Sequence, residues 1–96
     1  MSSGADGAVT RVMKIVNEKG LHARASAKFV QLVEKYDAKV SVSRNGESAG
    51  GDSIMGLMML AAGIGTSITV SATGAQATQV IDALDALVSS RFGEDE

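Results

Sequence analysis

Cysteine is absent from the 96 residues of the chain, which excludes disulfide bonds, thiol catalysis and thiolate metal sites. The aromatic residues are few, namely Phe29, Tyr36 and Phe92, and none lies in a segment with a strand-like pattern. A sheet that stacks nucleic-acid bases on aromatic rings is therefore not expected. The single histidine, His22, cannot provide the three or four protein ligands of a usual metal site, so we expect neither a metal nor another cofactor.

A strong net charge and long apolar runs are also lacking. The formal net charge is −2, and without the three acids at 94–96 the nine basic residues face eight acidic ones, which argues against nucleic acid as a partner. The longest nearly apolar stretch, 54–64, is about half of the roughly 20 residues that span a bilayer. Residues 1–7 have no basic start and no apolar segment, so no signal peptide is expected. We expect a cytoplasmic protein that binds no membrane.

The composition that remains predicts a single folded domain. With 45% hydrophobic and 21% charged residues, the chain is expected to fold at 8–93, between a disordered tail at 1–7 and an acidic tail at 94–96. Alternation of apolar and polar residues predicts four strands, at 11–16, 38–43, 47–50 and 67–72. Helical spacing predicts three helices, at 23–36, at 53–60 with Gly63 and Gly65 ending it, and from 77 to a stop at Gly93.

Two local features refine this arrangement. Asn45-Gly46 joins the second and third predicted strands and is the favoured sequence of a type I′ hairpin turn. The third strand is rich in Gly and Ser, which predicts an edge position. The order β-α-β-β-α-β-α is typical of a two-layer α+β domain, in which helices cover one face of an antiparallel sheet.

The start of the first helix carries charge of the wrong sign for stability. Residues 20–26 include no acid and place Arg24 and His22 at an end that the helix dipole already makes positive. An anion would suit this end, because free N–H groups there bind phosphate and Arg24 adds a charged donor. A neutral imidazole beside such a site is a nucleophile for phosphoryl transfer. The alternative, on the residues alone the more common one, is a surface or capping histidine.

The second predicted helix is apolar almost all round, although a short helix on a sheet buries only one side. Leu57 and Leu60 are spaced to face the core. The residues left exposed would be Ile54, Met55 and Met58, a polarizable surface suited to protein partners. The alternative is a helix that is deeply packed on all sides.

Ser53 opens this second helix, and two roles are open to it. The default role is an N-cap, worth roughly 1 kcal/mol. The other is a phosphorylation site, because added negative charge would lie at the favourable end of the helix dipole and beside the apolar surface.

These motifs resemble those of the HPr family, the histidine-containing phosphocarrier proteins of the phosphoenolpyruvate-dependent phosphotransferase systems. Residues 20–24, followed by 27–30, are similar to the active-site motif of the family, and 53–58 are similar to its regulatory-serine motif. The similarity covers about residues 9–91. It implies an HPr-like domain at 8–93 with an open-faced β-sandwich fold, strand order 1-4-2-3 and three helices on one face.

The resemblance also implies a role for each site residue. His22 would accept a phosphoryl group on Nδ1 from enzyme I and pass it to an enzyme IIA, with Arg24 stabilising the charge. Ser53 would be the target of an HPr serine kinase/phosphorylase. The partner-docking surface would include Ile54, Met55 and Met58. The protein would be a monomeric phosphoryl carrier rather than an enzyme, acting in sugar transport and its regulation.

Two positions depart from the family pattern. Ala25 stands where the family often has proline, and Asp52 precedes Ser53 where many sugar-transport members have lysine. The second departure leaves open whether the chain acts in sugar transport or in a nitrogen-type or other regulatory branch. A rival interpretation is a small ligand-sensing or regulatory α+β binding domain in which His22 is only a cap.

Overall fold

Strands and helices alternate in the predicted order β-α-β-β-α-β-α in the computed structural model, which describes residues 8–93. The tails expected at 1–7 and 94–96 lie outside the described residues. The elements are β1 (Val9–Lys14), α1 (Ala23–Val33), β2 (Lys39–Arg44), β3 (Glu47–Gly50), α2 (Ile54–Met59), β4 (Ser67–Thr73), α3 (Ala77–Ser89) and a 3-10 turn, η2 (Arg91–Gly93). Within 8–93, no helix combines the length and the apolar content needed to cross a membrane.

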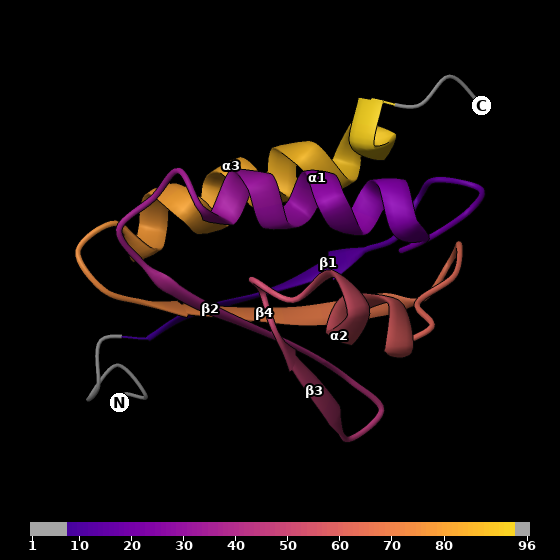
Figure 1. Ribbon diagram of the computed structural model, residues 1–96, viewed down its shortest axis with the longest axis horizontal. Helices are drawn as coiled ribbons and strands as arrows, with labels where there is room; N and C mark the ends of the chain where they lie inside the picture. Colours follow the sequence, from indigo (N-terminus) through magenta and orange to yellow (C-terminus); the bar gives the residue numbers. More distant parts are fainter. Residues whose placement is uncertain (1–7, 94–96) are drawn as a thin grey trace.

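The four described strands form one antiparallel sheet in the order β1-β4-β2-β3 (Figure 1). β4 lies at the centre, paired with β1 on one side and β2 on the other. Because side chains alternate along a strand, Ile68, Val70 and Ala72 all point into the core, as predicted. In the described sheet β3 pairs only with β2, which confirms the edge position. Asn45 and Gly46 both have positive φ, 53° and 83°, which fits the predicted hairpin turn.

The helices pack on one face of this sheet. α1 and α3 lie side by side above it, and α2 contacts both α1 and β3 (Figure 1). Phe29 of α1, Leu57 of α2, Val70 of β4 and Leu84 of α3 are fully buried in one core. On the other face, Val12 of β1 is exposed, and no helix of residues 8–93 covers it. The predicted open-faced α+β sandwich with three helices is therefore confirmed.

Arg11 interrupts the apolar face of β1 because it pairs with α3. Its Nη2 lies 2.9 Å from Asp82 Oδ1, and its Nη1 donates to Asp85 Oδ2 at 3.1 Å. The pKa of Arg11 is raised above its ordinary value, and the hydrogen bond with Asp82 is the largest cause. The three side chains remain open to solvent, so the cluster orients α3 on β1 more than it stabilises the fold.

Element boundaries differ from those predicted. β1 covers Val9–Lys14 rather than 11–16, and α1 ends at Val33 rather than at 36. α2 ends before Ala61, which adopts a left-handed φ of 54°, so the expectation that Gly63 and Gly65 end this helix was wrong. α3 ends at Ser89, and Gly93 instead closes the following 3-10 turn.

The turn after α3 places an aromatic side chain in the core. Arg91 and Phe92 both have left-handed φ, which leaves Phe92 fully buried. Lys28 of α1 donates through Nζ to the Phe92 carbonyl at 2.6 Å. The tertiary contact between the end of the chain and α1 therefore overrides the local preference of two non-glycine residues.

Candidate functional site

His22 is the N-cap of α1. Its backbone is extended, with φ −75° and ψ −177°, and its Nδ1 accepts a hydrogen bond from the Arg24 backbone N–H at 3.1 Å. The His22 carbonyl in turn accepts from the Ser26 N–H at 2.9 Å. The imidazole is half-buried, and the first turn of α1 contains no acid. The ring therefore lies at the positive end of the helix, with Nδ1 facing a backbone donor.

The loop before His22 rests directly on the loop after α2. The Leu21 N–H donates to the Ala62 carbonyl at 3.0 Å. Gly20 has a φ of +63°, and a Cβ at this position would collide with the Ala62 oxygen and lie 2.8 Å from the Gly63 Cα. Only glycine suits both the left-handed conformation and this close approach. The backbone of 20–21 is thus held at the end of α2.

Two buried polar side chains that the sequence analysis missed hold the same loop. Asn17 donates through Nδ2 to the Gly20 carbonyl at 2.9 Å, and Ser26 donates through Oγ to the Leu21 carbonyl at 3.2 Å. Both are fully buried. The alternation of Met13 and Ile15, which face the core, continues to position 17 and was the available signal.

Arg24 is exposed beside the capped imidazole. Within residues 8–93 its guanidinium forms no ion pair with a carboxylate. In the same part of the chain, no three His, Asp or Glu side chains gather into a potential metal site. The charges around His22 therefore suit an anion that arrives from outside.

A shallow depression of about 190 Å³ adjoins His22. Its lining combines the loop before α1 with the loop after α2, and comprises Lys19, Leu21, His22, Ala61, Ala62 and Gly63. The structure thus brings His22 next to the C-terminal end of α2. Ser53 lies at the opposite end of this six-residue helix, about 9 Å along its axis at 1.5 Å per residue.

α2 buries one side and exposes the other. Leu57 and Leu60 are buried, whereas Ile54, Met55 and Met58 are exposed, as their spacing predicts. The alternative of a deeply packed helix was wrong. Met59, which the sequence analysis did not single out, is also exposed. We call the exposed residues of α2, namely Ile54, Met55, Met58 and Met59, the α2 patch.

Ser53 is the N-cap of α2. Its Oγ accepts a hydrogen bond from the Gly56 N–H at 2.9 Å, and its backbone is extended. A Cβ on Gly56 would lie 3.0 Å from both this oxygen and the Ala49 Cβ, so a glycine keeps the cap accessible to its donor. The capping role is thus present in the structure.

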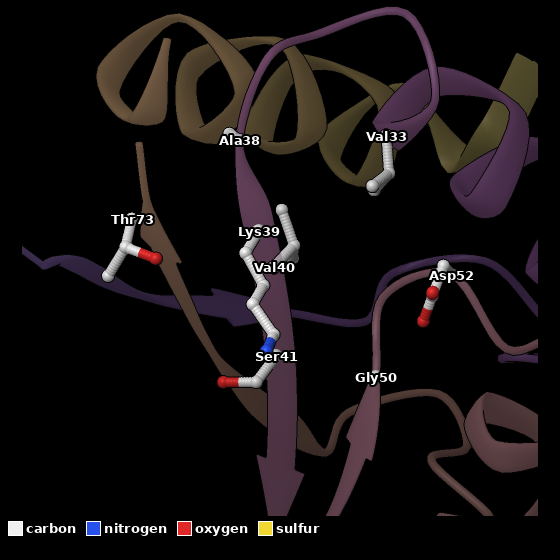
Figure 2. A pocket seen from close by; sticks show the side chains of 8 residues that line it. All are labelled: Val33, Ala38, Lys39, Val40, Ser41, Gly50, Asp52 and Thr73. Carbon is white, nitrogen blue, oxygen red and sulfur yellow. The ribbon is translucent and has the colours of Figure 1, made fainter. Parts of the chain in front are cut away.

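A larger depression, of about 360 Å³, lies at a different place, where the end of α1 passes over β2 (Figure 2). Figure 2 shows Val33 projecting from α1, Lys39 and Ser41 on β2, and Asp52 in the loop before α2. The lining residues are Val33, Ala38, Lys39, Val40, Ser41, Gly50, Asp52 and Thr73. His22 and Arg24 are not among them, so these two predicted site residues lie outside this depression.

Comparison with known proteins shows the family of the chain. The family model described as "PTS HPr component phosphorylation site" matches residues 9–90. The chain belongs to the HPr family. The phosphocarrier protein HPr of Cupriavidus necator is 51% identical over 82 residues, covering 85% of this chain and 92% of that protein. HPr of Pseudomonas aeruginosa is 48% identical over 83 residues, with coverage of 85% and 92%.

A solved structure shows the same HPr fold. The crystal structure of an HPr from Thermoanaerobacter tengcongensis superposes with a TM-score of 0.87 and 35% sequence identity, covering 92% of this chain and 99% of that one. HPr proteins are phosphocarriers of the phosphotransferase system, and they are carriers rather than catalysts.

We expect Gly20→Ala to disturb the His22 loop, because the new Cβ meets the Ala62 carbonyl and the left-handed φ disfavours alanine. The free energy of unfolding should fall by about 1 to 3 kcal/mol or more, as for other strained backbone positions. Urea denaturation measures this change. Gly63→Ala is the matched control, since a Cβ there meets nothing within 4 Å and its stability should change little. Equal losses in the two variants would contradict the proposed packing.

Proposed function

We propose that the chain carries a phosphoryl group on Nδ1 of His22, accepting it from phosphorylated enzyme I and passing it to an enzyme IIA. The observation that carries this proposal is the position of Nδ1 at the N-terminus of α1, in hydrogen-bond contact with the Arg24 N–H. Membership of the HPr family supports the same role. As a carrier, the protein is regenerated by each transfer and has no independent substrate turnover.

The hydrogen bond at His22 supports Nδ1 as the nucleophilic nitrogen of the imidazole. Because Nδ1 of His22 accepts from an N–H, its lone pair is free of a proton, and the ring proton of the neutral form lies on Nε2. In the transfer, Nδ1 forms a bond to phosphorus while the bond from phosphorus to the donor of enzyme I breaks. The Nε2 proton stays in place, so the step needs no separate base.

The same N–H can then bind the product. Once Nδ1 is bonded to phosphorus it no longer accepts from Arg24, and the backbone donor needs another acceptor. A phosphoryl oxygen attached to Nδ1 is a stronger, charged acceptor at the same helix end. Arg24, whose backbone N–H contacts Nδ1, is exposed, so its guanidinium can also approach the transferring phosphoryl group. We therefore assign charge stabilisation to Arg24.

The docking surface in this proposal includes Ile54, Met55 and Met58. These residues are exposed and apolar, and they lie on a helix that contacts α1. The depression beside His22 is lined by the loop that leaves α2, so a partner seated on α2 would also reach the imidazole. Methionine side chains adapt to different partners, which suits a carrier that must dock to a donor and to an acceptor in turn.

Regulation is proposed at Ser53, through phosphorylation by an HPr serine kinase/phosphorylase. The Ser53 hydroxyl is half-buried at the start of α2, and the neighbouring Asp52 is exposed. A phosphate would bring roughly −1.5 to −2 charges beside the docking surface. That charge would change how partners bind α2 without removing the acceptor that caps the helix.

The central test uses His22→Asn, because the Asn side chain can still cap α1 through its oxygen but offers no nucleophilic nitrogen. Incubation with enzyme I and phosphoenolpyruvate should add one acid-labile phosphoryl group, about +80 Da, to the wild-type chain and none to the variant. Intact mass before and after acid treatment measures this, and nitrogen NMR of the ring identifies Nδ1. An acid-labile phosphate on His22→Asn would refute the assignment.

Arg24→Ala should fold like the wild type but transfer phosphate more slowly. Removing one electrostatic donor from a transition state typically costs about 2.7 to 4 kcal/mol, or roughly 100- to 1,000-fold in rate. Rapid-quench kinetics with phosphorylated enzyme I measures the rate. Lys35→Ala removes the same charge from an exposed site beyond the far end of α1 and serves as the control. If both variants slow transfer equally, net charge rather than the position of Arg24 is responsible.

Ser53→Asp should lower affinity for enzyme I without lowering the melting temperature. Asp is as good an N-cap as Ser, so α2 keeps its start, while the added charge must be desolvated on docking. We expect a loss of at least about tenfold in affinity, or about 1.4 kcal/mol. Calorimetric titration and melting curves are compared with Ser53→Asn, an uncharged cap of the same shape. Identical affinities for the Asp and Asn variants would show that Ser53 is only a cap.

A further inference from the structure

Methionines are distributed unevenly among the described residues 8–93. Met55, Met58 and Met59 all lie on α2, where they are 68%, 37% and 74% exposed. Met13 of β1 lies in the core and is only 2% exposed. Among these residues, the thioether groups that solvent can reach are therefore gathered on α2, whose outer face is apolar.

We propose that the α2 patch is a site of reversible methionine oxidation, with Met55 and Met59 as the primary targets and Met58 as a slower one. The oxidant is a two-electron peroxide, hydrogen peroxide being the simplest. The Sδ lone pair attacks one oxygen of hydrogen peroxide, and an S–O bond forms as the O–O bond breaks. The hydroxide that leaves takes the proton of the transferred oxygen and becomes water. Sulfur is oxidised by two electrons and the peroxide is reduced by two, so the step is balanced.

The chemical consequence is a change of surface character. A thioether is apolar and polarizable, whereas a sulfoxide is polar, chiral and a hydrogen-bond acceptor. Two or three sulfoxides on a helix of six residues would replace much of its apolar outer face. A partner that buries this face must then desolvate the new S–O dipoles, so oxidation should weaken docking. This effect on docking rests on the proposed function.

The fold should tolerate the modification. α2 is attached to the core by Leu57 and Leu60, which are buried and contain no oxidisable atom. Its start is held by the Ser53 cap, and the carbonyl of its C-cap, Leu60, accepts from Arg44 Nη1 at 3.1 Å. None of these contacts uses a methionine sulfur. Oxidation would therefore change the surface and leave the attachment of the helix intact.

The first arm of the test concerns the chain alone and needs no partner. After limited treatment with hydrogen peroxide, peptide mass spectrometry should show oxidation of Met55 and Met59 first, then Met58. Met13 should react on the order of tenfold more slowly or not at all, because susceptibility follows exposure. The melting temperature should stay within a degree or two of the untreated chain. Oxidation of Met13 at the same rate as Met55, or unfolding that accompanies α2 oxidation, would overturn the inference.

The second arm measures docking. Calorimetric titration with enzyme I should show about tenfold weaker affinity for the oxidised chain, and treatment with methionine sulfoxide reductases A and B should restore it. In the control variant, Met55, Met58 and Met59 are all changed to Leu. Its affinity for enzyme I is measured before and after peroxide treatment, and the two values should be equal. Equal affinities of the oxidised and untreated wild type would overturn the docking effect alone. Absence of binding by the untreated chain would instead overturn the proposed function, and the docking effect with it.

Discussion

The backbone contact between Leu21 and Ala62 is the constraint on which the site depends. It joins the loop that ends in His22 to the loop that leaves α2, and it exists because Gly20 has no side chain in the way. Through this contact, a cap at the start of one helix and an apolar face on another become parts of one continuous surface. Asn17 and Ser26 hold the same loop from the core side, so His22 projects from a fixed backbone.

Much of this could be predicted from local patterns. The alternation in β4 and the spacing of Leu57 and Leu60 each encode which side of an element is buried, and both predictions were confirmed. The absence of acid at the start of α1 is found in the structure, while the anion site inferred from it stays a prediction. The order of the strands in the sheet could not be predicted from local patterns, because strand pairing joins residues that are distant in the sequence. It followed only from the family resemblance.

The parts that could not be predicted depend on tertiary contacts. Nothing about an alanine suggests a left-handed backbone, yet Ala61 adopts one because the chain must turn at once to bring Ala62 against Leu21. Phe92 is similar, since burial of its ring outweighs the strain of its backbone. The polar side chain of Asn17 lies in the core because the alternation of Met13 and Ile15 continues to position 17, and there its Nδ2 donates to the Gly20 carbonyl. In each case the local preference is weaker than the contact that opposes it.

In the proposed function Nδ1 has two roles, and these would account for a property that a carrier needs, namely that it can give up a phosphoryl group as readily as it takes one. In the free chain, Nδ1 satisfies the Arg24 N–H, so leaving the phosphorylated state does not expose an unpaired helix donor. In the phosphorylated state, a phosphoryl oxygen can accept from the same N–H of Arg24. An N-cap exchange of this kind keeps the hydrogen-bond count of the helix start equal in the two states. Under this proposal, the free-energy difference between the two states would be set by the phosphorus–nitrogen bond and the nearby charges, chiefly Arg24, rather than by refolding of α1.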